Sequence, residues 1–151
     1  MDRIVVGVDG SDQSRTALRW AVDEARVHGA ALEVVHAYDD TPAYEVYRYP
    51  AGLPSVEEVE ARHERMAAYA TDLVEGMVAE LGTDLGIEVT AEAVQGRRPA
   101  QVLLERAKGA DLLVVGTRGR GGFAGLLLGS VSQQCIHHAP CPLAVVPTHE
   151  H

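Results

Sequence analysis

A glycine-rich segment near the carboxyl end of the chain carries the residue types that bind phosphate. It reads GTRGRGGFAGLLLGS from Gly116 to Ser130, with five glycines before Gly129. Glycine accepts positive φ angles and lets a ligand approach backbone amides closely. Arg118 or Arg120 can neutralise phosphate oxygens, and the hydroxyls of Ser130 and Ser132 can donate to them. The segment therefore predicts a loop that captures an anion.

Two common phosphate motifs do not account for this segment. A P-loop requires a Gly-Lys pair, and the chain has none. Gly119–Ala124 satisfies the G-x-G-x-x-[GA] pattern of dinucleotide-binding folds, but that pattern also needs an acidic residue about 20 positions later. Pro140 stands there, and no Asp or Glu occurs between Asp111 and Glu150. A Walker-type NTPase is excluded, and the dinucleotide match is weak.

The elements that must position this loop alternate along the chain. Short apolar runs predict strands, and apolar residues three or four apart predict helices. Ser11 and Ser55 are expected to cap helices, and Asp39–Pro54 to form an ordered surface excursion. The expected strands are 3–8, 31–38, 87–94, 111–116 and 142–146, and the expected helices are 12–28, 56–81, 99–108 and 130–138. Within the second helix, one face carries Val59, Met66, Ala70, Leu73, Met77 and Leu81.

The character of the strands predicts their order in the sheet. After their first residues, Arg3 and Asp111, strands 3–8 and 111–116 are apolar, as central strands covered on both faces must be, whereas 87–94 alternates like an edge strand. This favours a single α/β domain with a doubly wound, five-stranded parallel sheet in the order 3-2-1-4-5 and helices on both faces. Ligands bind such sheets beyond the carboxyl ends of the strands, where the order reverses. The glycine-rich segment and Asp9 both follow strands that end there.

Asp9 has two interpretations. It ends an apolar strand and precedes Gly10-Ser11, which is typical of a turn or helix-cap residue. Its predicted place opposite the glycine-rich segment favours a ligand role instead, in which the carboxylate accepts hydrogen bonds from ribose hydroxyls.

The spacing of the glycines resembles a known motif. Gly116-Thr117-Arg118-Gly119, then nine residues, then Gly129-Ser130 is similar to the G-x-x-G-x9-G-[ST] motif of ATP-binding universal stress proteins. The opening RIVVGVDGSDQSRTALRWAVDEA, the strand ending VVHAY and the closing CIHHAPCPLAVVP resemble the same family. The resemblance covers one domain, 1–148, followed by a short tail, 149–151.

The resemblance implies a site for ATP and a homodimer. Asp9 would lie near the ribose and the backbone around Ala37 near the adenine. The phosphates would lie against Gly116, Gly119, Gly129, Ser130, Val131 and Ser132. The dimer would form through the last strand, Pro142–Val146, and the residues support this independently, because an apolar edge strand left unpaired invites association.

Chemistry beyond binding has little support. Between Gly116 and Ser132 there is no Asp or Glu to act as a base or to hold a metal beside the phosphates. We therefore expect a regulatory ATP-binding protein with at most slow hydrolysis, in which Asp9 or water holds Mg²⁺. The alternatives are a slow ATPase or adenylate-transferring enzyme, a cyclic-AMP sensor, and a nucleotide-free scaffold.

Charge and composition narrow the partners. A net charge of −9 and a sequence pI near 5.1 argue against a nucleic-acid surface or an anionic membrane. No apolar run reaches the roughly 20 residues of a membrane span and the N-terminus lacks a signal-peptide pattern, so a cytoplasmic location is expected. Cys135, His137, His138 and Cys141 lack the usual zinc spacing, and no metal is predicted there.

Overall fold

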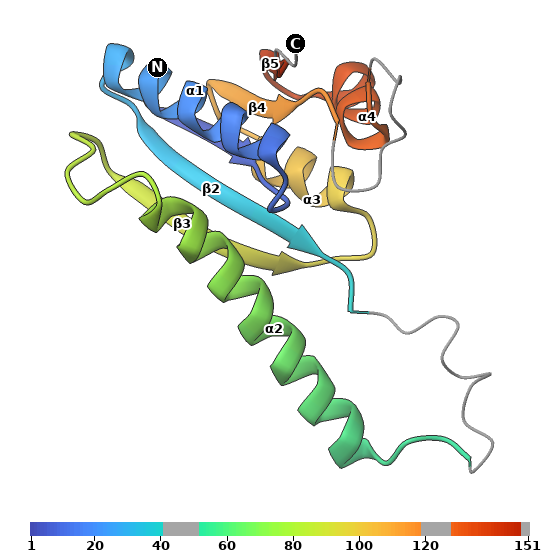
Figure 1. The fold of residues 1–151 in the computed structure, drawn as a ribbon. Coiled ribbons are helices and arrows are strands. Elements are labelled where there is room, and N and C mark those ends of the chain that lie inside the picture. Colours follow the sequence, from blue (N-terminus) through green and yellow to red (C-terminus); the bar gives the residue numbers. More distant parts are fainter. Residues whose placement is uncertain (41–51, 119–127, 149–151) are drawn as a thin grey trace.

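The computed structural model describes residues 1–40, 52–118 and 128–148, in which strands and helices alternate (Figure 1). The strands are β1 (Arg3–Gly7), β2 (Ala31–Tyr38), β3 (Val89–Gln95), β4 (Leu112–Gly116) and β5 (Leu143–Val146). The helices are α1 (Asp12–His28), α2 (Val56–Ala79), α3 (Pro99–Arg106) and α4 (Ser130–His138). The predicted elements are confirmed, with ends that differ by one or two residues.

The sheet is parallel throughout and has the order β3-β2-β1-β4-β5, which confirms the predicted topology. The strand β1 lies at its centre, where Val6 is paired with Val34 of β2 and with Val114 of β4. These three valines are fully buried, as expected for strands covered on both faces. The edge strand β3 alternates between exposed and half-buried residues.

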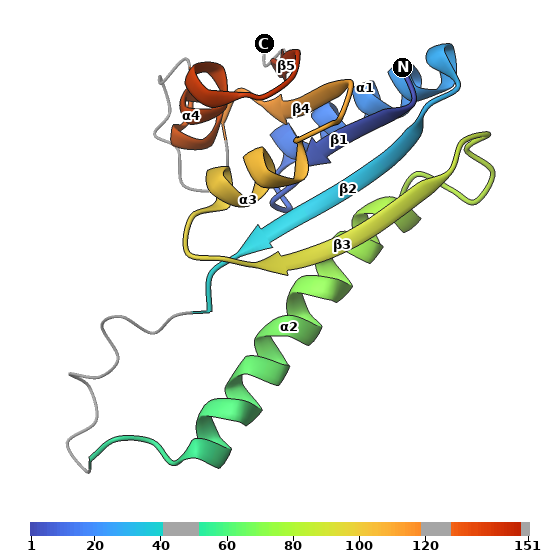
Figure 2. The same cartoon turned by 180° about the vertical axis from the view of Figure 1, so that it is seen from behind.

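The helices cover both faces of the sheet, two on each (Figures 1 and 2). On one face α1 and α2 pack against Val6, Val34 and Val114 through side chains such as Leu18 and Val74. On the other face α3 and α4 pack against alternate strand residues through Leu103 and Cys135. Burial of these two apolar layers stabilises the sheet whose carboxyl edge carries the candidate site.

The helix ends follow the predicted capping residues. The hydroxyl of Ser11 accepts a hydrogen bond from the Ser14 N–H at 3.1 Å, at the start of α1. That helix ends at Gly29, which adopts φ 63°, a left-handed conformation that favours glycine. The hydroxyl of Ser55 accepts from the Glu58 N–H at 3.1 Å and caps α2.

The helix α2 departs from the prediction along its first half. Its buried residues are Ala70, Val74 and Met77, whereas Val59, expected on the buried face, is 39% exposed. The cause is length: 24 residues of helix span about 36 Å, while the eight residues of β2 span about 26 Å. The amino-terminal half of α2 therefore extends past the sheet (Figure 2).

Candidate functional site

Asp9 lies in the turn that joins β1 to α1. Its Oδ1 accepts hydrogen bonds from the Ser11 N–H at 2.9 Å and from the Ser11 hydroxyl, and its own N–H donates to the Ser14 hydroxyl at 3.2 Å. These bonds fix the direction of the carboxylate at the entrance to α1. The turn interpretation of Asp9 is thus confirmed, while contact with a ribose stays a prediction.

The two ends of the glycine-rich segment meet at Thr117, directly after β4. The Thr117 carbonyl accepts from the Gly129 N–H at 2.6 Å and from the Ser132 hydroxyl at 2.9 Å. The Thr117 N–H in turn donates to the Val146 carbonyl of β5 at 3.3 Å. The start of α4 is therefore joined to the carboxyl end of β4. Gly119 and Arg120 fall within 119–127, outside the described residues.

The amino terminus of α4 offers backbone N–H groups at this edge. The first bond between successive turns runs from the Gln133 N–H to the Gly129 carbonyl at 3.0 Å. The N–H groups of Ser130, Val131 and Ser132 therefore belong to the first turn, which has no acceptor within the helix and carries the positive end of its dipole. Such a terminus attracts anions.

The two serines of this turn differ in what their hydroxyls do. Ser130 is exposed, whereas Ser132 is 2% exposed and its hydroxyl donates to the Thr117 and Gly129 carbonyls at 2.9 and 3.0 Å. In this structure the Ser132 hydroxyl therefore holds the ends of the glycine-rich segment together. The sequence does not reveal this role of Ser132, because its hydrogen-bond partners are backbone carbonyls, which every residue type has.

Packing between two elements also explains why position 116 is a glycine, a reason that the sequence analysis missed. A Cβ placed on Gly116 would lie 3.2 Å from the backbone carbonyl oxygen of Gln13, near the start of α1. A backbone atom of a packed helix cannot move aside cheaply, so this position favours glycine whether or not a ligand is bound. Close approach between α1 and β4 thus accounts for one glycine of the motif.

The remaining predicted residues lie along the same edge of the sheet. Arg118 is half-buried just beyond β4. Ala37 is half-buried near the end of β2, where it is paired with Val94 of β3. Since β1 separates β2 from β4, Ala37 and Gly116 stand about 10 Å apart across the strands. The fold therefore brings Asp9, Ala37, Gly116 and the α4 terminus to one edge.

Comparison with known proteins identifies the family. A profile described as the universal stress protein family matches residues 1–147. The chain belongs to the universal stress protein family. It is 39% identical over 145 residues to a universal stress protein of Thermus aquaticus, which covers 95% of this chain and 96% of that protein.

Other curated relatives of this universal stress protein domain are longer. A universal stress protein of Mycolicibacterium smegmatis is 37% identical over 144 residues, which make up 95% of this chain and 47% of that protein. The chain thus spans about half the length of this relative.

Solved structures share the fold and include nucleotide complexes. The hypothetical protein MJ0577 matches with a TM-score of 0.78 at 22% identity, over 99% of this chain and 98% of that one. A universal stress protein in complex with cAMP matches with a TM-score of 0.58 at 31% identity, over 98% of both chains. One from Archaeoglobus fulgidus in complex with dAMP matches with a TM-score of 0.54 at 25% identity, over 96% and 97%. Structural relatives therefore bind adenine nucleotides.

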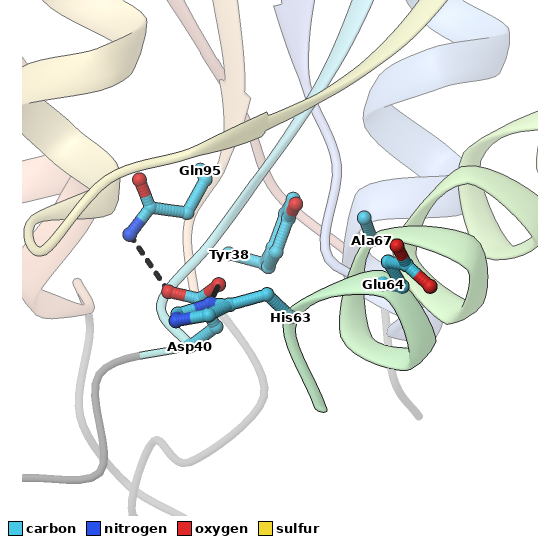
Figure 3. A pocket seen from close by; sticks show the side chains of 6 residues that line it. All are labelled: Tyr38, Asp40, His63, Glu64, Ala67 and Gln95. Carbon is cyan, nitrogen blue, oxygen red and sulfur yellow. Dashed lines mark hydrogen bonds and ion pairs between the residues drawn. The ribbon is translucent and has the colours of Figure 1, made fainter. Parts of the chain in front are cut away.

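A pocket of about 380 Å³ lies farther along the same edge of this universal stress protein fold, between the ends of β2 and β3 and the first half of α2 (Figure 3). Asp40 in this pocket is 5% exposed and accepts hydrogen bonds from the Gln95 amide at 2.8 Å and from His63 Nδ1. Burial raises the pKa of Asp40, but the bonds from His63 and Gln95 outweigh it and leave that pKa below its usual value.

The pocket escaped sequence analysis because its partners are far apart in the chain. Asp40 is 23 positions from His63 and 55 from Gln95. The other residues that line the pocket are Tyr38, Glu64 and Ala67. The segment 41–51, most of the predicted surface excursion, lies outside the described residues.

The cysteine and histidine cluster near α4 holds no metal-like arrangement. Among residues 1–40, 52–118 and 128–148, no group of three or more His, Cys, Asp or Glu side chains is placed to bind a metal ion. Cys135 is fully buried, and burial raises the pKa of its thiol to about 11.

None of the helices in the described part of the chain has the length and apolar character to cross a bilayer.

Proposed function

We propose that this protein is a regulatory module that binds ATP at the carboxyl edge of β1 and β4 and hydrolyses it slowly or not at all. The observation that carries the proposal is the junction at Thr117, which holds the amino terminus of α4 beside the end of β4. Both ends of a motif with the G-x-x-G-x9-G-[ST] spacing meet at this junction. Relatives solved with cAMP and dAMP support an adenine nucleotide as the ligand.

The proposed roles follow the order of the strands. Asp9 accepts from ribose hydroxyls, and the backbone at Ala37 contacts the adenine. The phosphates lie against the first-turn N–H groups of α4, with Arg118 as the neutralising side chain. The other phosphate-contacting residues are Gly116, Gly119, Gly129, Ser130, Val131 and Ser132. In this proposal Ser132 contributes its backbone N–H, because its hydroxyl already bonds to Thr117.

A magnesium ion would accompany the triphosphate rather than sit in a protein cage. Mg²⁺ is commonly held by one or two carboxylates together with phosphate oxygens and several waters. The carboxylate of Asp9 is at the same edge, and its Oδ1 is already engaged with Ser11. Asp9 or water would hold the ion, which would neutralise phosphate charge.

Slow turnover is part of the proposal. Fast phosphoryl transfer needs a positioned base and metal-binding carboxylates beside the phosphates, and residues 116–132 contain no acid. Turnover is expected far below the roughly 1–100 s⁻¹ of typical kinases. The alternative of a slow ATPase or adenylate-transferring enzyme predicts that ADP or AMP accumulates from bound ATP over hours.

The experiment begins with the purified protein. It is denatured and the released small molecules are identified by mass spectrometry, after which ATP binding to nucleotide-free protein is measured by calorimetry. Gly119→Val is expected to abolish binding. Gly76→Val is the matched control, because a Cβ at Gly76 has no neighbour within 4 Å and the residue lies on α2, away from the edge. Equal ATP affinity of the two variants would refute the proposed site.

A cyclic-AMP sensor is the second candidate, favoured by the 31% identical relative solved with cAMP. A single phosphate would occupy part of the α4 terminus in that case. Competition calorimetry distinguishes the ATP-binding module from the cyclic-AMP sensor. Displacement of bound ATP by an equal concentration of cyclic AMP would refute the ATP proposal in favour of the sensor, whereas retention of ATP supports the ATP proposal.

A homodimer through β5 is also proposed. Within the described residues β5 is hydrogen-bonded on one side, to β4, and its Leu143, Ala144 and Val145 are half-buried. Pairing with a second copy would cover this apolar edge.

A further inference from the structure

His36 is a buried polar side chain in an otherwise apolar part of β2. It is 9% exposed, and its Nδ1 lies 2.9 Å from the carbonyl oxygen of Val8. Because a carbonyl only accepts, Nδ1 carries the hydrogen and donates it. The neighbouring residues of β2 on the same face, Leu32 and Val34, are fully apolar and buried. An apolar residue would therefore fill this place without the cost of desolvating an imidazole.

The bond from His36 acts on the turn that carries Asp9. Val8 follows the last residue of β1, and its N–H donates to the Val35 carbonyl at 2.9 Å. Val8 is thus held by β2 on both sides, at its N–H by Val35 and at its carbonyl by His36. The Val8 carbonyl and the Asp9 nitrogen belong to one planar peptide group. The hydrogen bond from the His36 imidazole therefore also fixes the orientation of the peptide plane that leads into Asp9.

The turn beyond this peptide is sharply bent. Gly10 adopts φ +85°, and a Cβ there would lie 3.2 Å from Leu73 of α2. The Asp9 carboxylate bonds to Ser11 at the start of α1. Asp9 therefore sits between an anchor on α1 and the anchor that His36 provides on β2. The His36 ring lies stacked beside the Tyr38 ring, with ring centroids 6.4 Å apart.

We propose that His36 is a positioning residue of the nucleotide site, which directs Asp9 toward the ribose through its hydrogen bond to the Val8 carbonyl. The inference rests on the proposed function, in which Asp9 accepts from the ribose hydroxyls. A residue that only fills the core would affect stability, whereas a positioning residue affects the part of the affinity that depends on those hydroxyls.

The test compares ATP with 2′,3′-dideoxy-ATP by calorimetry on nucleotide-free protein. Wild type is expected to bind ATP more tightly. His36→Leu removes the donor and is expected to weaken ATP binding about tenfold, the equivalent of about 1.4 kcal/mol, while dideoxy-ATP binding changes less than threefold. His36→Asn retains an N–H close to the position of Nδ1 and should restore discrimination between the two nucleotides.

Two controls separate positioning from general damage. Val34→Ala creates a cavity on the same strand and face, so it should lower the melting temperature and leave the ratio of the two affinities unchanged. In an Asp9→Ala background, His36→Leu should have no further effect on ATP affinity. If His36→Leu does not fold, His36→Gln serves instead, because its amide lies one bond farther out and misses the Val8 carbonyl.

Each outcome decides the matter. Equal weakening of both nucleotides by His36→Leu, or no weakening, overturns the inference and leaves the ATP site standing. Wild type that binds both nucleotides equally also overturns it, because Asp9 then does not read the ribose. Wild type that binds neither overturns the proposed function together with the inference.

Discussion

At the scale of the residue, neighbouring positions of one motif do different work. Ser130 and Ser132 both belong to the first turn of α4, yet one is exposed and the other is 2% exposed. The buried Ser132 hydroxyl joins the ends of the glycine-rich segment at Thr117, whereas Ser130 is exposed to solvent. Residue type alone does not separate a ligand-binding hydroxyl from a structural one.

This difference predicts that two matched substitutions affect different quantities, one the stability of the protein and the other its affinity for ATP. Ser132→Ala removes a hydroxyl that bonds to Thr117 and Gly129, and should lower the free energy of unfolding by about 1 kcal/mol without nucleotide. Ser130→Ala removes an exposed hydroxyl, and should change stability by less than about 0.5 kcal/mol while weakening ATP binding. Urea unfolding and calorimetry measure both quantities. A destabilised Ser130→Ala with unchanged ATP affinity would contradict the assignment.

At the scale of the element, α2 consists of an anchored half and a projecting half. Its carboxyl half packs on the sheet through Ala70, Val74 and Met77. Its amino half reaches beyond the sheet, where His63 bonds to Asp40 at the end of β2. Apolar packing therefore holds the carboxyl half of α2, and a polar contact holds its amino half.

Core and projecting positions of α2 should respond differently to the same substitution. Val74 is fully buried, and Val74→Ala is expected to cost about 2 kcal/mol through lost burial and a residual cavity. Val56 is 73% exposed, and Val56→Ala should change stability by less than about 0.5 kcal/mol. Urea denaturation followed by circular dichroism compares the two. Similar costs would mean that the first turn of α2 is packed in solution.

The polar contact of α2 predicts a dependence on pH. The pKa of Asp40 is lowered from 3.8 in the folded protein, so the ionised carboxylate contributes stability above that pH and loses it as pH falls through the folded pKa. Asp40→Asn should therefore lower stability at pH 7, on the order of 1 kcal/mol because His63 is half exposed and solvent screens the pair. The difference from wild type should shrink toward pH 3 in urea unfolding curves. A constant difference would contradict this linkage.

At the scale of the whole molecule, the two ends of the sheet have separate tasks. Toward the amino ends of the strands, ion pairs join Arg3 to Glu33 at 2.9 Å, and Arg106 to Glu33 and Glu92 at 2.9 and 2.7 Å. This network links β1, β2, β3 and α3. The carboxyl edge carries Asp9 and the α4 terminus instead. This network of ion pairs and the candidate site therefore lie toward opposite ends of the strands.

The sheet edge at β5 predicts the state of assembly. The Pro142 carbonyl accepts from Leu113 of β4 and the Val146 carbonyl from Thr117 just after it. By strand alternation the backbone N–H of Val145 is therefore directed away from β4. Val145→Pro removes an outward N–H that a second copy would use, and edge strands tolerate proline. Light scattering after gel filtration should give a dimer for wild type and a monomer for Val145→Pro. A dimer that survives this change would place the interface elsewhere.

The sequence by itself determined the alternation of elements, the order of the sheet and the edge at which the candidate site lies. These follow from the periodicity of apolar residues and from Gly116 and Gly129, which act locally along the chain. Only the tertiary structure decided which side chains meet across the fold. Asp40 finds His63 and Gln95, and His36 finds Val8, because packing brings together groups whose partners are set by distance in space and leave no pattern in the chain.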